Sequence, residues 1–196
     1  PSYFDVVAYS GTNSATTISH NLGAVPEMIW VKSRANANRW TVFHKDQGPT
    51  KRAFLELTQA FDTGTVWNNT APTSTVFSVG TDSNTNSSGH TFIAYLFATV
   101  AGVSKVGSVT HSSGSTTNVD CGFSSGARFV LVKSTAVGYW RVWDSVRGIV
   151  AGNDPYIHLN DTSAEVTNGD LIDPYSGGFA LAPSFYTDTY IFYAIA

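Results

Sequence analysis

Cysteine and charged residues are both scarce in this sequence of 196 residues. The single cysteine, Cys121, excludes a disulfide within these residues, so the fold must depend on packing and hydrogen bonding. Charged residues make up 13% and the formal net charge is −3, which leaves no basic surface to neutralise phosphates or anionic lipid. We therefore expect no nucleic acid among the partners.

Long hydrophobic runs are also missing. The longest apolar stretch, residues 92–103, is interrupted by Thr99 and Gly102 and is shorter than the roughly 20 residues that a membrane-spanning helix needs. The sequence predicts no transmembrane segment, no signal peptide and no insertion into a membrane. The helix formers Lys, Glu, Gln and Met are few, which argues against a helical fold.

Aromatic residues and turn formers are abundant instead. Aromatic side chains make up 13%, and 17 glycines accompany many Ser, Thr and Asn residues. This is the composition of β-sheets joined by polar turns. A chain of this length buries roughly 70% of its unfolded surface, so we expect an all-β fold with a full core.

One pattern occurs twice. Residues 28–33 (MIWVKS) are followed by residues 40–44 (WTVFH), and residues 129–134 (FVLVKS) by residues 140–144 (WRVWD). In each copy an apolar run ends on Lys-Ser, a polar loop follows, and Trp begins a second alternating segment. Further matches keep a spacing of 98 to 102 positions: Lys32 with Lys133, Trp40 with Trp140, Leu57 with Leu159, Phe77 with Phe179, and residues 91–98 with residues 189–196.

The duplication predicts two homologous β repeats, residues 1–101 and residues 102–196. We expect them to form an antiparallel β-sandwich, jelly-roll-like, with a pseudo-two-fold relation and packed as one compact unit, or two sandwiches related by a pseudo-two-fold axis. The first repeat should contain a hairpin of the two signature segments and a central strand at residues 91–97. Other strands are expected at residues 3–10, 15–19, 53–57 and 76–79, and residues 81–89 are expected to form a polar loop.

No catalytic constellation emerges from the sequence. Glu56 and Glu165 lie in or near strands, but Glu56 matches His158 in the second repeat, so the duplication yields no pair of carboxylates for glycan hydrolysis. The histidines lack zinc-site spacing and no Gly-x-Ser-x-Gly elbow is present. We predict no catalytic residue, no metal and no cofactor, although a calcium ion bound by loop oxygens at residues 82–89 stays open.

Sugar binding fits the composition better, because it needs aromatic faces for pyranose rings beside amide and carboxylate groups for hydroxyls. Trp67 has a second interpretation as a core plug under a long loop, whereas Trp30, Trp40 and Trp140 lie on expected core faces. Divergent loops are the favoured places for function: residues 81–89 against 182–187, and residues 45–52 against 145–155. The candidate ligand-binding residues are Trp67, Asn68, Asn69, Asn84, Asn86 and Trp143.

The sequence resembles the paired-repeat domain of bacteriophage tail fibre and tail tip proteins, which is common in phages of marine bacteria and cyanobacteria. The resemblance covers nearly the whole chain. It is carried by residues 20–32, the Trp40 segment and residues 67–74 and 92–95, and in the second half by residues 129–133, 140–144, 147–148, 164–165, 178–179 and 189–191. One loop differs, since residues 121–127 stand where that family usually has a proline-containing loop.

The resemblance implies an extracellular virion protein of the phage tail. It implies recognition of a host-surface receptor, a glycan or an outer-membrane protein, together with other tail proteins as partners and a homotrimeric fibre. It carries over no catalytic residue. We therefore expect a non-enzymatic attachment domain, with two alternatives: a structural spacer of the fibre, or a polysaccharide-degrading enzyme.

Overall fold

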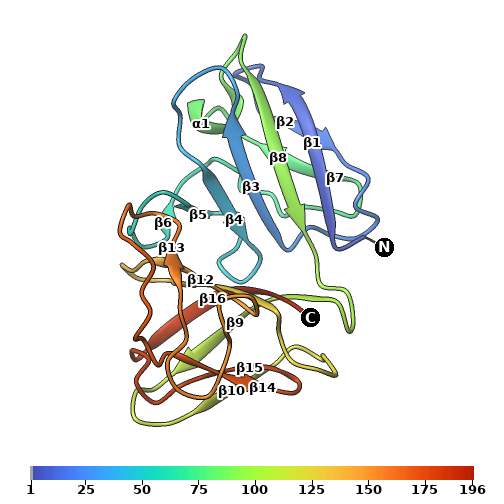
Figure 1. The fold of residues 1–196 in the computed structure, drawn as a ribbon. Coiled ribbons are helices and arrows are strands. Elements are labelled where there is room, and N and C mark those ends of the chain that lie inside the picture. The colour runs from blue at the N-terminus through green and yellow to red at the C-terminus, as the bar shows by residue number, and fades with distance from the viewer. Residues whose placement is uncertain (1) are drawn as a thin grey trace. The chain divides into compact units, whose positions relative to one another are not determined.

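A computed structural model describes residues 2–196 and divides the chain into two units, Pro1–Ala98 and Thr99–Ala196. The boundary falls three residues before the expected one. Nearly every regular element is a β-strand, and the described residues contain one helical turn, α1 (Ser83–Asn86) (Figure 1). The predicted all-β class is confirmed, whereas residues 81–89 contain a helical turn where a plain loop was expected.

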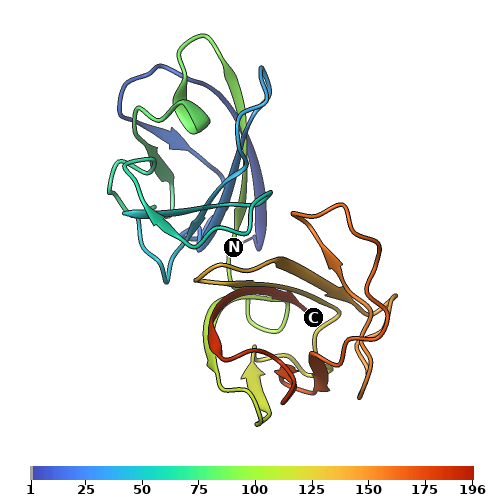
Figure 2. The same cartoon turned by 90° about the vertical axis from the view of Figure 1, so that its left-hand side faces the viewer.

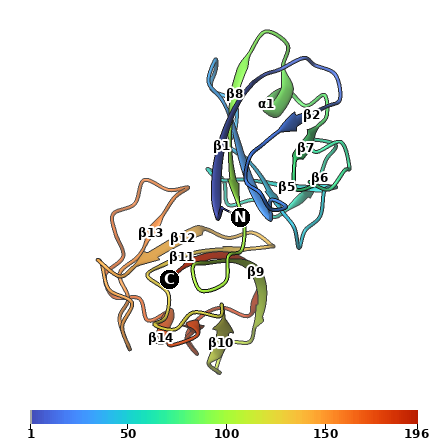
Figure 3. The ribbon, with the colours of Figure 1, turned by 90° about the vertical axis from the view of Figure 1, so that its right-hand side faces the viewer.

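The first unit is a sandwich of a six-stranded antiparallel sheet and a two-stranded sheet. The smaller sheet pairs β2 (Thr16–Ser19) with β7 (Val76–Val79), and it lies across from the larger one (Figure 2, Figure 3). The larger sheet follows the order β1 (Phe4–Ser10), β8 (Thr91–Phe97), β3 (Met28–Ser33), β4 (Thr41–His44), β5 (Lys51–Phe54) and β6 (Asp62–Thr63).

The second unit is a sandwich of a five-stranded and a three-stranded antiparallel sheet. The three-stranded sheet has the order β10 (Thr117–Asp120), β15 (Gly178–Leu181), β14 (Ile172–Tyr175). The five-stranded sheet follows the order β9 (Ser104–His111), β16 (Asp188–Ile195), β11 (Phe129–Ser134), β12 (Trp140–Asp144) and β13 (Ile157–His158).

The two units share one strand topology. In each, the first strand pairs with the last, the last pairs with the third, and the second pairs with the last but one. This nested pairing is jelly-roll-like, and it places β8 and β16 in the interior of their sheets, as predicted for residues 91–97. The common topology is what a duplication predicts; the duplication and the pseudo-two-fold relation themselves stay predictions.

Backbone hydrogen bonds correct one part of the expected register. Leu55 N donates to Trp40 O, and Leu159 N donates to Trp140 O, so Leu159 corresponds to Leu55 and not to Leu57. The Trp pair is 100 positions apart and the Leu pair 104, which gives the second unit four extra residues between β12 and β13. Strand β5 accordingly begins two residues before the predicted strand.

Each unit has its own hydrophobic core between its two sheets. In the first unit, Ile29, Val31 and Phe43 face Phe77 and Val79. Trp30 and Trp40 lie on the opposite face of that sheet, where Trp30 contacts Phe97 and Trp40 stacks on Tyr95. The prediction that Trp30 and Trp40 face the core is therefore wrong, because both faces of these strands are apolar and alternation alone did not distinguish them.

Candidate functional site

The two tryptophans among the predicted ligand-binding residues are buried. Trp67 is 2% exposed within the core of the first unit and Trp143 is 0% exposed within that of the second. Trp67 packs edge-on against Phe43, and Trp143 contacts Tyr156 and Phe185. Neither ring offers a face to a sugar, so the stacking role predicted for both is wrong and the alternative of Trp67 as a core plug holds.

Two of the predicted asparagines serve the fold. Asn86 is fully buried and its amide bonds to three backbone groups of neighbouring loops. Asn84 accepts a hydrogen bond from Arg39 N and donates one to Asp82. Both side chains are therefore committed within the first unit, and the ligand role predicted for Asn86 is wrong because its amide is not exposed.

Asn68 and Asn69 are exposed in the turn that follows Trp67. Both have left-handed backbone conformations, with φ of 52° and 48°, which asparagine tolerates better than most residues. Their identity is explained by this turn. A ligand role for the two side chains stays a prediction.

The calcium loop considered at residues 82–89 has its acidic group occupied. Asp82 Oδ1 accepts the hydrogen bond of Asn84 N that caps α1, and Asp82 Oδ2 lies 2.6 Å from Arg52 Nη1. Among residues 2–196, no group of three or more His, Cys, Asp or Glu side chains is arranged to hold a metal ion.

In the same part of the chain no helix has the length and apolar character needed to cross a membrane.

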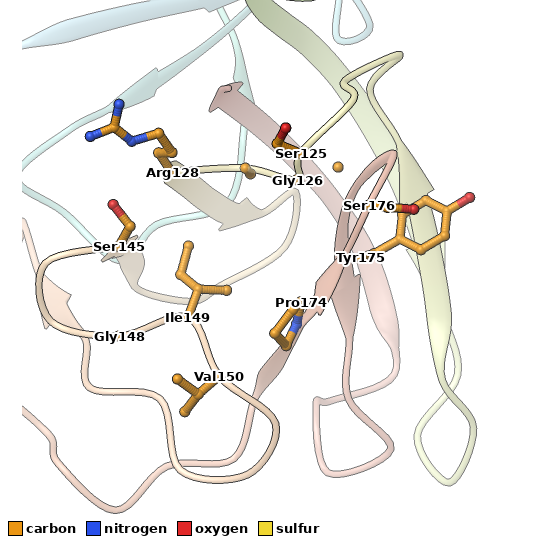
Figure 4. Close-up of a pocket in the computed structure, with 12 residues that line it drawn as sticks. Ser125, Gly126, Arg128, Ser145, Gly148, Ile149, Val150, Pro174, Tyr175 and Ser176 are labelled. Carbon is orange, nitrogen blue, oxygen red and sulfur yellow. The ribbon is translucent and has the colours of Figure 1, made fainter.

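A pocket of about 440 Å³ lies in the second unit (Figure 4). Three loops line it: the one before β11, the one between β12 and β13 with its four extra residues, and the β14–β15 hairpin. Its volume is in the range of small-molecule sites. The lining residues are Ser125, Gly126, Ala127, Arg128, Ser145, Gly148, Ile149, Val150, Pro174, Tyr175, Ser176 and Gly178.

Local chemistry fixes these loops in place. Gly126 has a φ of +79°, and a Cβ there would lie 3.0 Å from Tyr175 O, so glycine allows the close approach of loop and hairpin. Gly126 N donates to Ser176 O at 2.8 Å. Across the pocket, Asp154 is fully buried and accepts a hydrogen bond from Val150 N at 2.8 Å.

The pocket has an apolar wall and several free polar groups. Ile149, Val150 and Pro174 supply the wall, while Arg128 and Ser145 lie at one end and Tyr175 and Ser176 at the other (Figure 4). Within residues 2–196, the hydroxyls of Ser125, Ser145 and Ser176 and the guanidinium of Arg128 have no hydrogen-bond or ion-pair partner. Apolar surface beside unpaired hydroxyls and an unpaired cation suits a ligand rich in hydroxyl groups.

The lining contains no Asp, Glu, His or Cys. Of the groups used in general acid–base and nucleophilic catalysis, the lining offers serine and tyrosine hydroxyls without a histidine or carboxylate to activate them. The carboxylate pair required of most glycoside hydrolases therefore has no members in this lining.

The corresponding place in the first unit has different side chains. Glu27 N donates to Phe97 O as Arg128 N donates to Ile195 O, and Lys45 N donates to Glu27 O as Ser145 N donates to Arg128 O. Arg128 thus replaces Glu27 and Ser145 replaces Lys45. The second unit has a base where the first unit has an acid, and it has the longer loop. The first unit therefore lacks this combination of lining groups.

Part of this site could be expected from the sequence. Residues 145–155 were singled out because the copies diverge there, and residues 121–127 because they differ from the resembled family; both loops line the pocket. Arg128 and Tyr175 were missed. Matching Leu159 with Leu57 hid half of the four-residue insertion. The charge reversal from Glu27 to Arg128 has the same spacing of 101 positions as Lys32 and Lys133, so the sequence does contain a signal for it.

Comparison with known proteins gives one match. The sequence model of one protein family matches residues 1–196, and that family is described as a domain of unknown function (DUF7483). No curated protein and no solved structure matches the chain.

Proposed function

The chain belongs to the DUF7483 family, and we propose that it is a non-enzymatic saccharide-binding domain whose pocket in the second unit holds a sugar of a host-surface glycan. The observation that carries the proposal is the pocket of about 440 Å³ in which Arg128 and three serine hydroxyls have no partner within residues 2–196. The setting in a phage tail fibre, with host attachment and a homotrimer, comes from the sequence resemblance and is part of the same proposal.

The pocket matches the needs of a pyranose. The apolar side chains Ile149, Val150 and Pro174 suit the apolar C–H face of a sugar, while hydroxyls exchange hydrogen bonds with serine side chains. Arg128 adds a donor fork that takes two oxygen atoms at once. Such sites bind weakly one at a time, and a trimeric fibre would multiply them into avidity.

An array of bacterial capsule and lipopolysaccharide glycans, probed with the full chain, tests the proposal. We expect binding to a defined set of glycans, and a loss of about tenfold in affinity for Arg128→Gln, since a charge-assisted hydrogen bond is removed. Val150→Ala should weaken binding through the loss of apolar contact, since Val150 lines the pocket and is 47% exposed. Lys45→Gln is the matched control, because Lys45 occupies the place of Ser145 in the first unit, and it should bind as the wild type does.

The two alternatives give different results in the same experiment. A chain that binds no glycan and no host cell, and whose Arg128→Gln variant leaves phage adsorption unchanged, acts as a spacer. New reducing ends after incubation with host polysaccharide would identify an enzyme. Either result refutes the proposal.

A further inference from the structure

A second feature of the same unit is an arginine enclosed by aromatic rings. Arg141, on β12, places its guanidinium carbon 5.6 Å from the ring centre of Tyr139 and 5.8 Å from that of Tyr186. Tyr156 and Phe185 lie at 5.9 and 5.8 Å. Each ring is within the distance at which a cation is attracted to an aromatic face, so the rings hold the side chain in position.

No carboxylate neutralises this arginine. In the described part of the chain Arg141 makes no ion pair and no side-chain hydrogen bond, and its buried Nε has no acceptor. The nearby acids are engaged elsewhere: Asp161 accepts hydrogen bonds from Ser163 and lies 3.6 Å from His158, and Asp188 accepts a hydrogen bond from Ser134. A positive charge is therefore left available beside an aromatic surface.

The first unit shows how the same region looks when its charges are satisfied. There Glu56 accepts a hydrogen bond from Trp40 N, and it pairs with Arg39 at 3.5 Å. In the second unit Asn160 takes the same place, because its Oδ1 accepts from Trp140 N at 2.9 Å. An amide without charge has replaced the carboxylate, so the missing counter-charge is a property of this sequence.

Unpaired nitrogens gather around the arginine. His158 pairs with Arg141 across β12 and β13, and its Nε2 is buried without a partner. Asn160 Nδ2 is buried without a partner as well. Buried polar groups are nearly always hydrogen-bonded, so the unpaired N–H donors of Arg141 Nε and Asn160 Nδ2 indicate a place for an acceptor group.

Two of the rings are accessible to a ligand. Tyr186 is 63% exposed and Tyr139 is 37% exposed, and Tyr139 is stacked on His158 with 4.0 Å between ring centres. This arrangement gives two exposed aromatic rings close to an unneutralised guanidinium. The face of a sugar ring stacks on such surface, and an acidic substituent on that sugar pairs with the arginine.

We propose that Tyr139, Arg141 and Tyr186 form a second binding site, which takes a sugar carrying a carboxylate, such as a uronic acid of an acidic polysaccharide. A carboxylate carries one negative charge, which a single arginine can neutralise, whereas a phosphate carries up to two. On a chain of net charge −3 the second negative charge would be left without a partner, so a carboxylate is favoured. The site shares the ligand class of the proposed function, but it uses none of the residues that line the pocket.

Calorimetric titration of the full chain with trigalacturonate, and with its methyl ester as the neutral probe, tests this site. The ester keeps the sugar rings and removes the charges. We expect binding of the acid that is about tenfold tighter than that of the ester, and an equal loss for Arg141→Gln. Arg39→Gln in the first unit removes the same charge from an ion-paired arginine and should leave the affinity unchanged.

Tyr186→Ala is a second variant for the case that Arg141→Gln fails to fold, because this exposed ring is dispensable for the core. It should weaken binding of the acid by about fivefold. The proposal is overturned if acid and ester bind equally, or if the folded Arg141→Gln and Tyr186→Ala variants bind as the wild type does. It is also overturned if only Arg128→Gln reduces binding, because that result assigns the acid to the pocket. Loss confined to Arg141 and Tyr186 supports this site whether or not the pocket binds a sugar.

Discussion

Replacement of Asn86 by alanine should destabilise the first unit. The amide of Asn86 bonds to two loop segments: its Oδ1 accepts from Thr12 N at 2.8 Å, and its Nδ2 donates to Ser14 O of the same loop at 2.8 Å and to Gly80 O at 2.6 Å. The bond to Gly80 is buried, and its loss leaves an unpaired carbonyl at a cost of about 1–3 kcal/mol. The other two are partly buried and contribute about 0.5–1.5 kcal/mol each, so we expect about 4 kcal/mol in all.

Hydrogen exchange across a urea series, read by mass spectrometry on the full chain, measures this loss unit by unit. Exchange in residues 2–98 should reach the unfolded rate at lower urea for Asn86→Ala, while residues 99–196 keep the wild-type profile. Asn21→Ala is the control, because Asn21 is an exposed asparagine of the same unit. A loss below about 1 kcal/mol, or reduced glycan binding at unchanged stability, would refute the assignment of Asn86 to the fold.

Three more predictions concern buried groups. Trp67→Ala should cost the first unit about 3–5 kcal/mol and leave glycan affinity unchanged, which urea unfolding and the glycan array check together. Gly178→Ala should cost the second unit about 3 kcal/mol, because the new Cβ would lie 2.2 Å from Val119 O in the paired strand; an unchanged urea midpoint would contradict this. Burial raises the pKa of Asp154 from 3.8 to about 6, so the folded chain holds this proton more tightly than the unfolded chain. The resulting stability is complete below pH 3.8 and is lost as the pH rises through about 6; unfolding of wild type and Asp154→Asn at several pH values should show this slope in the wild type alone.

The strands were largely predictable because their signal is local. Apolar runs that end on Lys-Ser and alternate with polar loops defined β3, β4 and β11 within one residue, and the aromatic run at residues 91–97 defined β8 and its central place. The hydrophobic period of a strand and the residues of a turn are visible within a few positions of the sequence. They can therefore be recognised without knowing which strands pair with each other.

The candidate site was less predictable because it depends on which face of a strand is covered. Trp143 and Trp30 lie in strands that are apolar on both sides, so alternation did not tell the core face from the other one. Asn86 has the residue type of a surface ligand group, yet Gly80 and the sequence-distant loop that contains Thr12 and Ser14 close around it. The cluster around Arg141 combines β12, β13 and the loop before β16, which no local pattern connects.

The place of the last strand in each sheet has a consequence for synthesis on the ribosome. Strand β8 lies between β1 and β3, and β16 lies between β9 and β11, so the middle of each sheet is the last part to be made. Until that strand emerges, two strands present unpaired edges and the core of the unit stays open. Each unit is therefore expected to complete its fold late and in one step, and a chain cut short before residue 91 or residue 188 would expose the edges from which aggregation begins.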